Sequence, residues 1–458
     1  MTTDLESNPI ARHTLNCGLV ELGTHQTSEV SQTSEVLAKP FARTRHGLNR
    51  TWLERLGRRT LLARLEQLAH GEITLIEGDS SRTFGQQTES CSLRASLVVA
   101  RSQFYRRATF GGDVGAAESF MDGAWSCENL ADLVRILVVN ARLLAARPSR
   151  LAWITEPLRH VAHWFNRNTK SGSRRNISAH YDLGNDFFQL FLDETLMYSC
   201  GVFEGPDSTL LDASTAKNER ICRKLQLSPT DHLLEIGTGW GGFALHAARH
   251  YGCRITTTTI SREQYNFAVR RIADAGLADR VTVLLQDYRD LEGQYDKLVS
   301  IEMIEAVGDE FFDGYFAQCS RLLKPNGLLV LQGITIADQL YAGYICRVDF
   351  IQKYIFPGGC LPSVSRVCES LTRASDLRLF HLEDFAPHYA RTLSCWRDRF
   401  RARLDEVRGL GFDERFVRMW EYYLGYCEGA FLERNCGLVQ MVITKPECRR
   451  EPIAGQLV

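Results

Sequence analysis

Short apolar runs alternate with amphipathic segments along the C-terminal two-thirds of the chain. Strands that alternate with helices in this way indicate a parallel sheet covered by helices on both faces. Strands are predicted at His232–Ile236, Arg254–Thr259, Val281–Leu285, Tyr295–Ile301 and Gly327–Gly333, and further strands near Leu377–Leu382 and Leu438–Thr444 would complete a seven-stranded sheet. We therefore predict an α/β, doubly wound (Rossmann-like) domain over residues 176–448.

The pattern before residue 145 differs and predicts a smaller α+β domain over residues 41–145. Leucines at helical spacing and an excess of arginine mark Phe41–His70 as a basic amphipathic helix or pair of helices. Short strands are predicted for ITLIEGD, SLRASLVVA and FYRRATF, which begin at Ile73, Ser92 and Phe104. A helix follows, with apolar residues at i, i+3 and i+4 spacing: Leu130, Leu133, Val134, Leu137 and Val138.

Two segments fall outside these domains. Residues 1–40 are rich in Ser and Thr and lack sustained apolar periodicity, so we predict a disordered tail. Residues 146–175 read as a basic aromatic linker, because Arg142–Arg175 holds eight Lys or Arg against Glu156 alone, with Trp153 and Trp164 among them. That composition suits an anionic membrane surface, and it equally suits a solvated linker whose tryptophans pack on a neighbouring domain.

Composition narrows the class of protein. The 458 residues are 44% hydrophobic and 24% charged, as in globular proteins, and 54 Lys and Arg against 55 Asp and Glu give no support for a nucleic-acid partner. The chain shows no apolar run long enough to span a bilayer and no secretory signal, so we expect a cytoplasmic location. The 14 cysteines form no CxxC pair or zinc-spaced cluster, so we predict free thiols and no metal site.

The most informative local signal is HLLEIGTGWGG, where the first predicted strand ends. Glu235 precedes Gly237, Gly239 and Gly241, and glycines at such a turn let backbone amides approach a ligand closely. A nicotinamide site would also need an acidic residue about 20 residues further on, at the tip of the next strand. The second strand is followed instead by hydroxyl and amide side chains, Thr259, Ser261 and Gln264, which can hold a ribose. The third strand is followed by Asp287 and Tyr288, which can bind and stack on an adenine. These residues favour S-adenosylmethionine as the ligand.

Six motifs in order resemble the cyclopropane-fatty-acyl-phospholipid synthases. They are HYDLGNDFFQLFLDETLMYSCGVF from His180, LLEIGTGWGG, TTISREQ, LLQDYRDL, YIFPGGCLPS from Tyr354 and WEYYLGYCEGAF from Trp420. The resemblance implies a class I methyltransferase domain that moves a methyl group from S-adenosylmethionine to the cis double bond of an acyl chain in a membrane phospholipid. Loss of a proton to a bound bicarbonate ion would then close a cyclopropane ring.

The same resemblance assigns roles to residues. The cofactor would contact Tyr198 and Ser199 in addition to the glycine-turn, Thr259-to-Gln264 and Asp287–Tyr288 residues. Cys427 matches the position customarily labelled as the active-site cysteine, although the chemistry needs no covalent nucleophile and a buried core cysteine is the simpler interpretation. The cradle for bicarbonate would include Cys200, Glu305, the Ile334 backbone and Tyr389. Gln332, at a position where a histidine is usual, can still donate a hydrogen bond to an anion.

Two departures from the better-known pattern leave the product open. Ala306 and Gln332 stand where a histidine is usual, and an amide cannot carry a proton as imidazole can. A proton lost elsewhere would give a methyl- or methylene-branched chain. A soluble small-molecule N-methyltransferase is the alternative of a different class, whereas a non-enzymatic lipid-binding protein would need a broken glycine turn, which is absent. The resemblance also implies a homodimer that associates peripherally with the inner membrane surface, with transient contact to anionic lipid.

Overall fold

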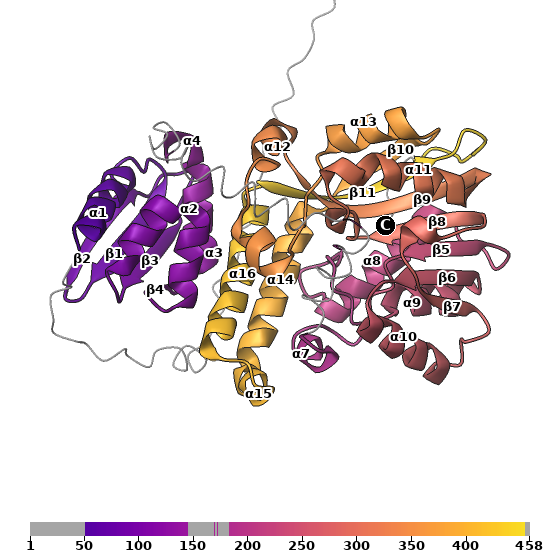
Figure 1. The fold of residues 1–458 in the computed structure, drawn as a ribbon, viewed down its shortest axis with the longest axis horizontal. Helices are drawn as coiled ribbons and strands as arrows, with labels where there is room; N and C mark the ends of the chain where they lie inside the picture. Colours follow the sequence, from indigo (N-terminus) through magenta and orange to yellow (C-terminus); the bar gives the residue numbers. More distant parts are fainter. Residues whose placement is uncertain (1–50, 145–168, 170–171, 173–182, 454–458) are drawn as a thin grey trace, which may run out of the picture. The chain divides into compact units, whose positions relative to one another are not determined.

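The computed structural model describes residues 51–144, 169, 172 and 183–453 (Figure 1). The predicted tail, most of the predicted basic linker, and the ends of the two predicted domains at residues 41–50 and 176–182 lie outside the described residues.

The N-terminal region contains a four-stranded mixed sheet in the order β2-β1-β3-β4. Strand β1 pairs antiparallel with β2 and parallel with β3, and β3 pairs antiparallel with β4. Helix α1 starts with a capping box in which Thr51 and Glu54 satisfy each other's backbone amides. The elements are α1 (Trp52–Leu65), β1 (Gly71–Glu77), β2 (Ser80–Gln86), β3 (Arg94–Val99), α2 (Gln103–Met121), β4 (Trp125–Cys127), α3 (Leu130–Val139) and α4 (Ala141–Leu144).

One predicted strand is wrong. The segment FYRRATF forms the start of helix α2, although its aromatic residues and threonine favour strands. Phe104 and Tyr105 are adjacent and both buried, a pattern that a strand with one buried face does not give. Strand β2 was missed because it alternates little, with Phe84 as its buried residue, and β4 was missed because it is short.

The C-terminal region contains the seven-stranded sheet that the sequence predicts, in the order β10-β11-β9-β8-β5-β6-β7. Neighbours among β5 to β9 pair in parallel, whereas β11 runs antiparallel to both β9 and β10. The strands are β5 (His232–Ile236), β6 (Arg254–Thr259), β7 (Val281–Leu285), β8 (Tyr295–Ile301), β9 (Leu323–Ile336), β10 (Arg378–Asp384) and β11 (Cys436–Thr444). The fold class is therefore confirmed, with a mostly parallel sheet.

Helices cover both faces of this sheet because side chains on a strand alternate between faces. Leu233 packs with α8, α9 and α10, whereas Leu234, the next residue, packs with α11 and α13. Their bounds are α8 (Leu210–Leu225), α9 (Gly242–Tyr251), α10 (Arg262–Asp274), α11 (Phe312–Leu322) and α13 (Val364–Ala374).

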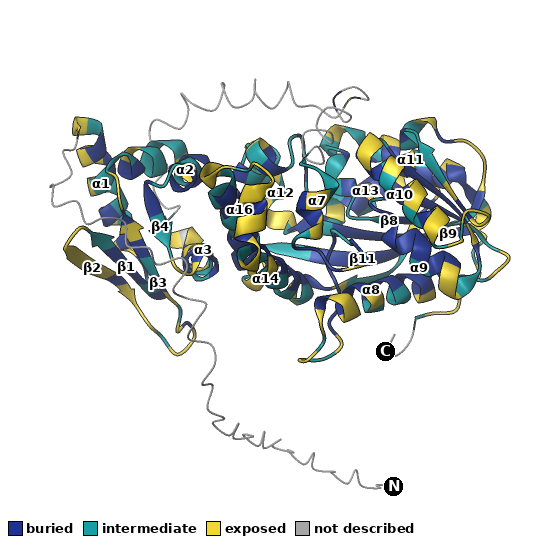
Figure 2. Cartoon of the chain, turned by 90° about the horizontal axis from the view of Figure 1, so that it is seen from below, coloured by how far each residue is buried: buried dark blue, intermediate teal, exposed yellow. Residues whose placement is uncertain are grey.

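A third group of helices carries an aromatic core. Helix α16 packs against α14 and also against α2 and α3. Gly429 permits the contact with α3, since a Cβ there would lie 2.7 Å from the Ala131 carbonyl oxygen. Figure 2 shows the inward faces of α14 and α16 as buried. The remaining helices are α7 (Asn185–Gln189), α12 (Asp338–Tyr344), a π-helical turn at Ile351–Ile355, α14 (Ala386–Ala402), α15 (Leu404–Gly409) and α16 (Glu414–Leu432), with 3₁₀ turns at Tyr288–Asp290, Ile304–Ala306 and Asp309–Phe311.

Within the described residues, no helix combines the length and apolar composition needed to cross a bilayer. The same part of the chain holds no cluster of His, Cys, Asp and Glu arranged to bind a metal ion.

Candidate active site

A cavity of about 1490 Å³ opens where β5, β6, β7 and β8 end. Ligands of open α/β sheets bind at this edge, outside the carboxyl ends of the strands. Most of the predicted site residues line it: Tyr198, Ser199, Glu235, Gly237, Gly239, Thr259, Gln264, Asp287, Tyr288, Glu305, Ile334, Tyr389 and Cys427. Four predicted site residues do not line the cavity and can affect a ligand only through neighbouring residues: Gly241, Ser261, Cys200 and Gln332.

The glycine turn follows β5 in left-handed backbone conformations. Gly237, Gly239 and Gly241 have φ of 107°, 53° and 82°, values that disfavour any side chain. A Cβ at Gly239 would meet no atom within 4 Å, so this residue faces open cavity, whereas a Cβ at Gly241 would contact Ala268 at 3.5 Å. Gly239 therefore leaves room for a ligand, and Gly241 lets α9 start close to α10.

Polar groups follow the next strands. Thr259 Oγ1 donates to Gln264 Oε1 at 2.8 Å, and Ser261 caps α10 by accepting from the Gln264 backbone amide. Asp287 is buried and paired with Arg289, whose Nη2 lies 2.7 Å from its Oδ2. Ser261 thus positions Gln264.

A buried lysine, which the sequence analysis missed, lies beside Ser199. Lys217 Nζ donates to Ser199 Oγ at 3.1 Å, and the side chain is fully buried. Burial lowers the pKa of Lys217 to about 8, while the nearby carboxylates of Glu302 and Asp193 oppose that fall. A signal for Lys217 was present, because it lies on the inward stripe of α8 with Ala213 and Ile221.

Glu302 is the second residue that the sequence analysis missed. Its Oε1 accepts from the Cys200 backbone amide at 2.9 Å and from Gln332 Nε2 at 2.7 Å. Its Oε2 accepts from Tyr389 Oη at 2.6 Å. Burial raises the pKa of Glu302, and these hydrogen bonds together with Lys217 oppose that rise. Cys200 and Tyr389, which were predicted to hold bicarbonate, therefore hold a carboxylate of the chain together with Gln332.

Glu305 lies near Glu302 but is differently placed. Its Oε1 accepts from the Ile334 backbone amide at 2.5 Å, and its buried Oε2 has no hydrogen-bond partner among the described residues. Burial first, and the charge of Glu302 second, raise the pKa of Glu305 to about 8. Glu305 is therefore mostly a neutral acid at pH 7.

Both candidate cysteines are protonated thiols. Burial raises the pKa of Cys427 and of Cys200 well above the ordinary value. A nucleophilic cysteine needs a lowered pKa, and neither residue has one. Cys200 contributes its backbone amide to the site, and Cys427 contributes a weakly polar wall.

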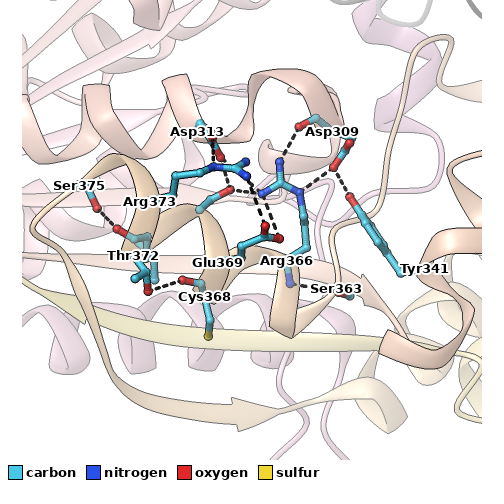
Figure 3. A network of polar contacts seen from close by, with 12 residues as sticks. Asp309, Asp313, Tyr341, Ser363, Arg366, Cys368, Glu369, Thr372, Arg373 and Ser375 are labelled. Carbon is cyan, nitrogen blue, oxygen red and sulfur yellow. Dashed lines mark hydrogen bonds and ion pairs between the residues drawn. The ribbon is translucent and has the colours of Figure 1, made fainter.

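Aromatic side chains line much of the cavity, and a polar network fastens one wall. The lining includes Tyr198, Trp240, Phe356, Tyr389, Tyr423, Tyr426 and Phe431. Helix α12 forms part of the wall, and Tyr341 ties it to the turn before α11 through a 2.5 Å hydrogen bond to Asp309 Oδ1 (Figure 3). Arg366 on α13 pairs with the same carboxylate at 2.8 Å. The cavity is thus apolar over much of its surface and held in shape.

Comparisons with known proteins identify the family of this chain. The sequence matches the family profile described as "Mycolic acid cyclopropane synthetase" over residues 168–441. It is 40% identical over 356 residues to the cyclopropane-fatty-acyl-phospholipid synthase of Escherichia coli (strain K12), which covers 77% of this chain and 89% of the relative. It is 38% identical over 369 residues to tuberculostearic acid methyltransferase UfaA1 of Mycobacterium tuberculosis (strain ATCC 25618 / H37Rv), which covers 79% and 85%.

Solved structures place the fold. The mycolic acid cyclopropane synthase CmaA1 complexed with SAH and CTAB superposes with a TM-score of 0.56 and 32% identity, covering 59% of this chain and 98% of that one. Coclaurine N-methyltransferase has a TM-score of 0.55 at 22% identity, which shows a shared fold. The protein is a class I S-adenosylmethionine-dependent methyltransferase. More narrowly, the chain belongs to the mycolic acid cyclopropane synthetase family, as its motifs predicted.

S-adenosylmethionine fits the residues at the glycine turn. The open space at Gly239 admits a ligand against the backbone. Glu235 is buried, and its Oε2 has no hydrogen-bond partner among the described residues, which leaves an acceptor for an ammonium or hydroxyl group. The individual cofactor contacts stay predictions.

Proposed function

We propose that this enzyme transfers a methyl group from S-adenosylmethionine to the cis double bond of an unsaturated acyl chain in a membrane phospholipid, giving a cyclopropane fatty acid. The observation that carries the proposal is a single cavity that joins the glycine turn to an aromatic-lined space next to two carboxyl groups. An acyl chain needs an apolar channel, and ring closure needs a base beside it.

The residues of the chain supply three things that this chemistry needs. S-adenosylmethionine, when bound, supplies an electrophilic methyl group. The aromatic faces of Tyr198, Tyr389 and Tyr423 line the cavity where the acyl chain would carry positive charge, and such faces stabilise cations. Apolar walls exclude water, which would otherwise capture that cation. The Glu302 carboxylate, which lines the cavity next to Glu305, offers a site for the proton that must leave.

Basic side chains support a phospholipid as the substrate. Arg64, Arg106 and Arg347 line the same cavity as the aromatic residues, and Arg106 is exposed. Guanidinium groups bind phosphate, the group that a phospholipid carries and a free fatty acid lacks. We infer transient, peripheral contact with an anionic bilayer, such as the inner membrane surface, because each cation near it adds on the order of 1 kcal/mol of attraction.

A branched product is the second candidate. Gln332, in place of the usual histidine, donates to Glu302 and cannot itself take up a proton, so the site of proton loss is the open step. The two relatives described above are named for different activities, a cyclopropane synthase and a tuberculostearic acid methyltransferase.

Expression in a host that lacks such an enzyme tests the proposal, with mass spectrometry of the fatty acid methyl esters. A gain of one CH₂ with cyclopropane fragmentation is expected, and the Gly239→Val variant should give none. Branched or methylene products would keep the lipid substrate and change the final step. Unchanged lipids, in the presence of purified protein that binds the cofactor, would favour a small-molecule substrate.

Separate assays define the lipid. Phospholipid vesicles, free unsaturated fatty acid and soluble amines are offered to the purified enzyme with labelled cofactor. We expect label in the phospholipid alone, with vesicle flotation that weakens as salt is raised. Equal labelling of free fatty acid would contradict the phospholipid assignment.

A further inference from the structure

We propose that the Glu302 carboxylate occupies the place of the bicarbonate ion that the family resemblance implies, and that Glu302 itself is the base of the reaction. This inference rests on the proposed function. Three groups predicted to cradle bicarbonate, namely the Cys200 and Ile334 amides and the Tyr389 hydroxyl, are engaged by carboxyl groups of the chain, whereas the fourth, Glu305, keeps an Oε2 without a partner among the described residues. The Cys200 amide, Gln332 Nε2 and Tyr389 Oη donate to Glu302, and the Ile334 amide donates to Glu305. The four donors are therefore already taken, and the residues do not fit an added bicarbonate.

The donors of Glu302 are themselves fixed. Gln440 Nε2 donates to Gln332 Oε1 at 2.8 Å, which turns the Gln332 amide nitrogen toward Glu302. Lys224 Nζ in turn donates to Gln440 Oε1 at 2.7 Å, which fixes the orientation of the Gln440 amide. This buried chain of polar groups orients a donor toward a carboxylate, and that carboxylate is Glu302.

The backbone conformation of Glu302 also supports a fixed carboxylate at this position. Its φ of 50° is left-handed, a conformation that glycine adopts freely and that costs another residue about 1 kcal/mol. A strained residue at a cavity wall persists when its side chain is held, and Glu302 has three hydrogen bonds. A glycine here would remove the strain and leave a space of about carboxylate size.

Charge also opposes a bicarbonate ion. A second anion would lie against the Glu302 carboxylate, with the Glu305 carboxyl group alongside. Lys217 is the buried cation that acts on Glu302. Lys217 already faces the carboxylates of Glu302 and Asp193, so an added bicarbonate would be buried without a counter-charge of its own, which is costly.

The proton transfer balances without an external ion. The methyl carbon forms a bond to one alkene carbon as its bond to sulfur breaks, which leaves a cation on the other alkene carbon. A C–H bond of the new methyl group then breaks, its electron pair closes the ring, and the proton goes to Glu302. Oε1 already accepts two hydrogen bonds and Oε2 one, so Oε2 keeps a lone pair for the proton. Release of that proton to solvent between turnovers restores the carboxylate.

Bicarbonate dependence tests the proposal. Wild-type enzyme and the Glu302→Gly variant are assayed in buffer purged of CO₂ and again with added bicarbonate. We expect wild-type activity to be the same in both, and the variant to lose at least about 100-fold without bicarbonate, as removal of a general base does. Added bicarbonate should raise the activity of the variant at least about tenfold. Wild-type activity that falls on purging and returns with bicarbonate would overturn the proposal.

Two further measurements test the role of Glu302 independently of misfolding and of the identity of the lipid substrate. The isosteric Glu302→Gln variant should lose activity without rescue by bicarbonate while its cofactor Kd stays within about twofold, and the exposed Glu292→Gln is the matched control. Binding of ¹³C-bicarbonate, followed by NMR, needs no lipid activity. Binding to Glu302→Gly but not to wild type is expected, and saturable binding to wild type would overturn the proposal even if the lipid substrate proves wrong.

Discussion

The two ends of the cavity are built in different ways. The cofactor end is made by backbone from contiguous motifs, with Gly237, Gly239 and Thr259 close together in sequence. The base end is made by groups from three distant segments that converge on Glu302: the Cys200 backbone amide and the side chains of Gln332 and Tyr389. The cofactor end can therefore be predicted from local sequence motifs, whereas the base end forms only when the folded sheet brings distant residues together.

The largest effect should come from filling the cofactor end. Gly239→Val places a side chain in open cavity and should weaken cofactor binding on the order of 100-fold, as measured by isothermal titration. Gly276→Val is the matched control, because Gly276 has a similar φ of 68° and open space around it, away from the cavity. Equal losses in both variants would show that backbone strain, and not the loss of ligand space, is responsible.

Removing the buried cation should disturb the base end while sparing the cofactor end. Lys217→Met leaves the Glu302 and Asp193 carboxylates uncompensated, so the free energy of unfolding should fall by about 3 kcal/mol. Because Lys217 lowers the pKa of Glu302, the acid limb of the activity profile should move to higher pH. Urea unfolding and a pH–rate profile measure these effects.

Lys324→Met, which removes a surface ion pair with Asp296, should cost less than about 1 kcal/mol. A loss of stability in Lys217→Met with no shift of the acid limb would contradict the electrostatic link between Lys217 and Glu302.

Glu305 should make the protein less stable as the pH rises. Its pKa is about 8 in the folded protein and near 4.5 when unfolded, so the folded state binds more protons between these values and its stability falls with rising pH. Glu305→Gln cannot ionise. The stability of this variant should therefore rise by about 3 kcal/mol relative to wild type between pH ~5.5 and pH ~8, measured by urea unfolding. A constant difference across this range would contradict a buried neutral acid.

The smallest effect is expected from the labelled cysteine. Cys427 is a protonated thiol on the cavity wall, so Cys427→Ser should keep activity within about threefold and leave the cofactor Kd unchanged. Steady-state kinetics on a folded variant measures this. Abolished turnover with intact cofactor binding would assign the sulfur a chemical role.

Much of the fold could be predicted from the sequence because buried strands and covering helices have distinct periods. Four strands, β5 to β8, begin and end where predicted, whereas β9 extends beyond its prediction at both ends. The strand prediction for FYRRATF was wrong because these strand-favouring residues form one end of α2, where tertiary contacts outweigh local preference.

The base end could be predicted only in part. The segment Ser300–Gly308, SIEMIEAVG, contains two glutamates, and the family resemblance selects Glu305. The left-handed backbone at Glu302, whose carboxylate accepts from Tyr389, has no sequence signature. The spacing of Lys217 places it on the inward stripe of α8, but the carboxylates that make its burial possible come from other segments and could not be predicted from that spacing.

Deuterium labelling of the cofactor tests whether a proton leaves the transferred methyl group, as ring closure with Glu302 as the base requires. Purified enzyme is given phospholipid vesicles and cofactor carrying a CD₃ methyl group, and the fatty acids are analysed by mass spectrometry. We expect a product that gains CD₂ in a ring, because one deuteron leaves the transferred methyl group. Retention of all three deuterons in the lipid would contradict proton loss from that carbon and with it the proposed role of Glu302.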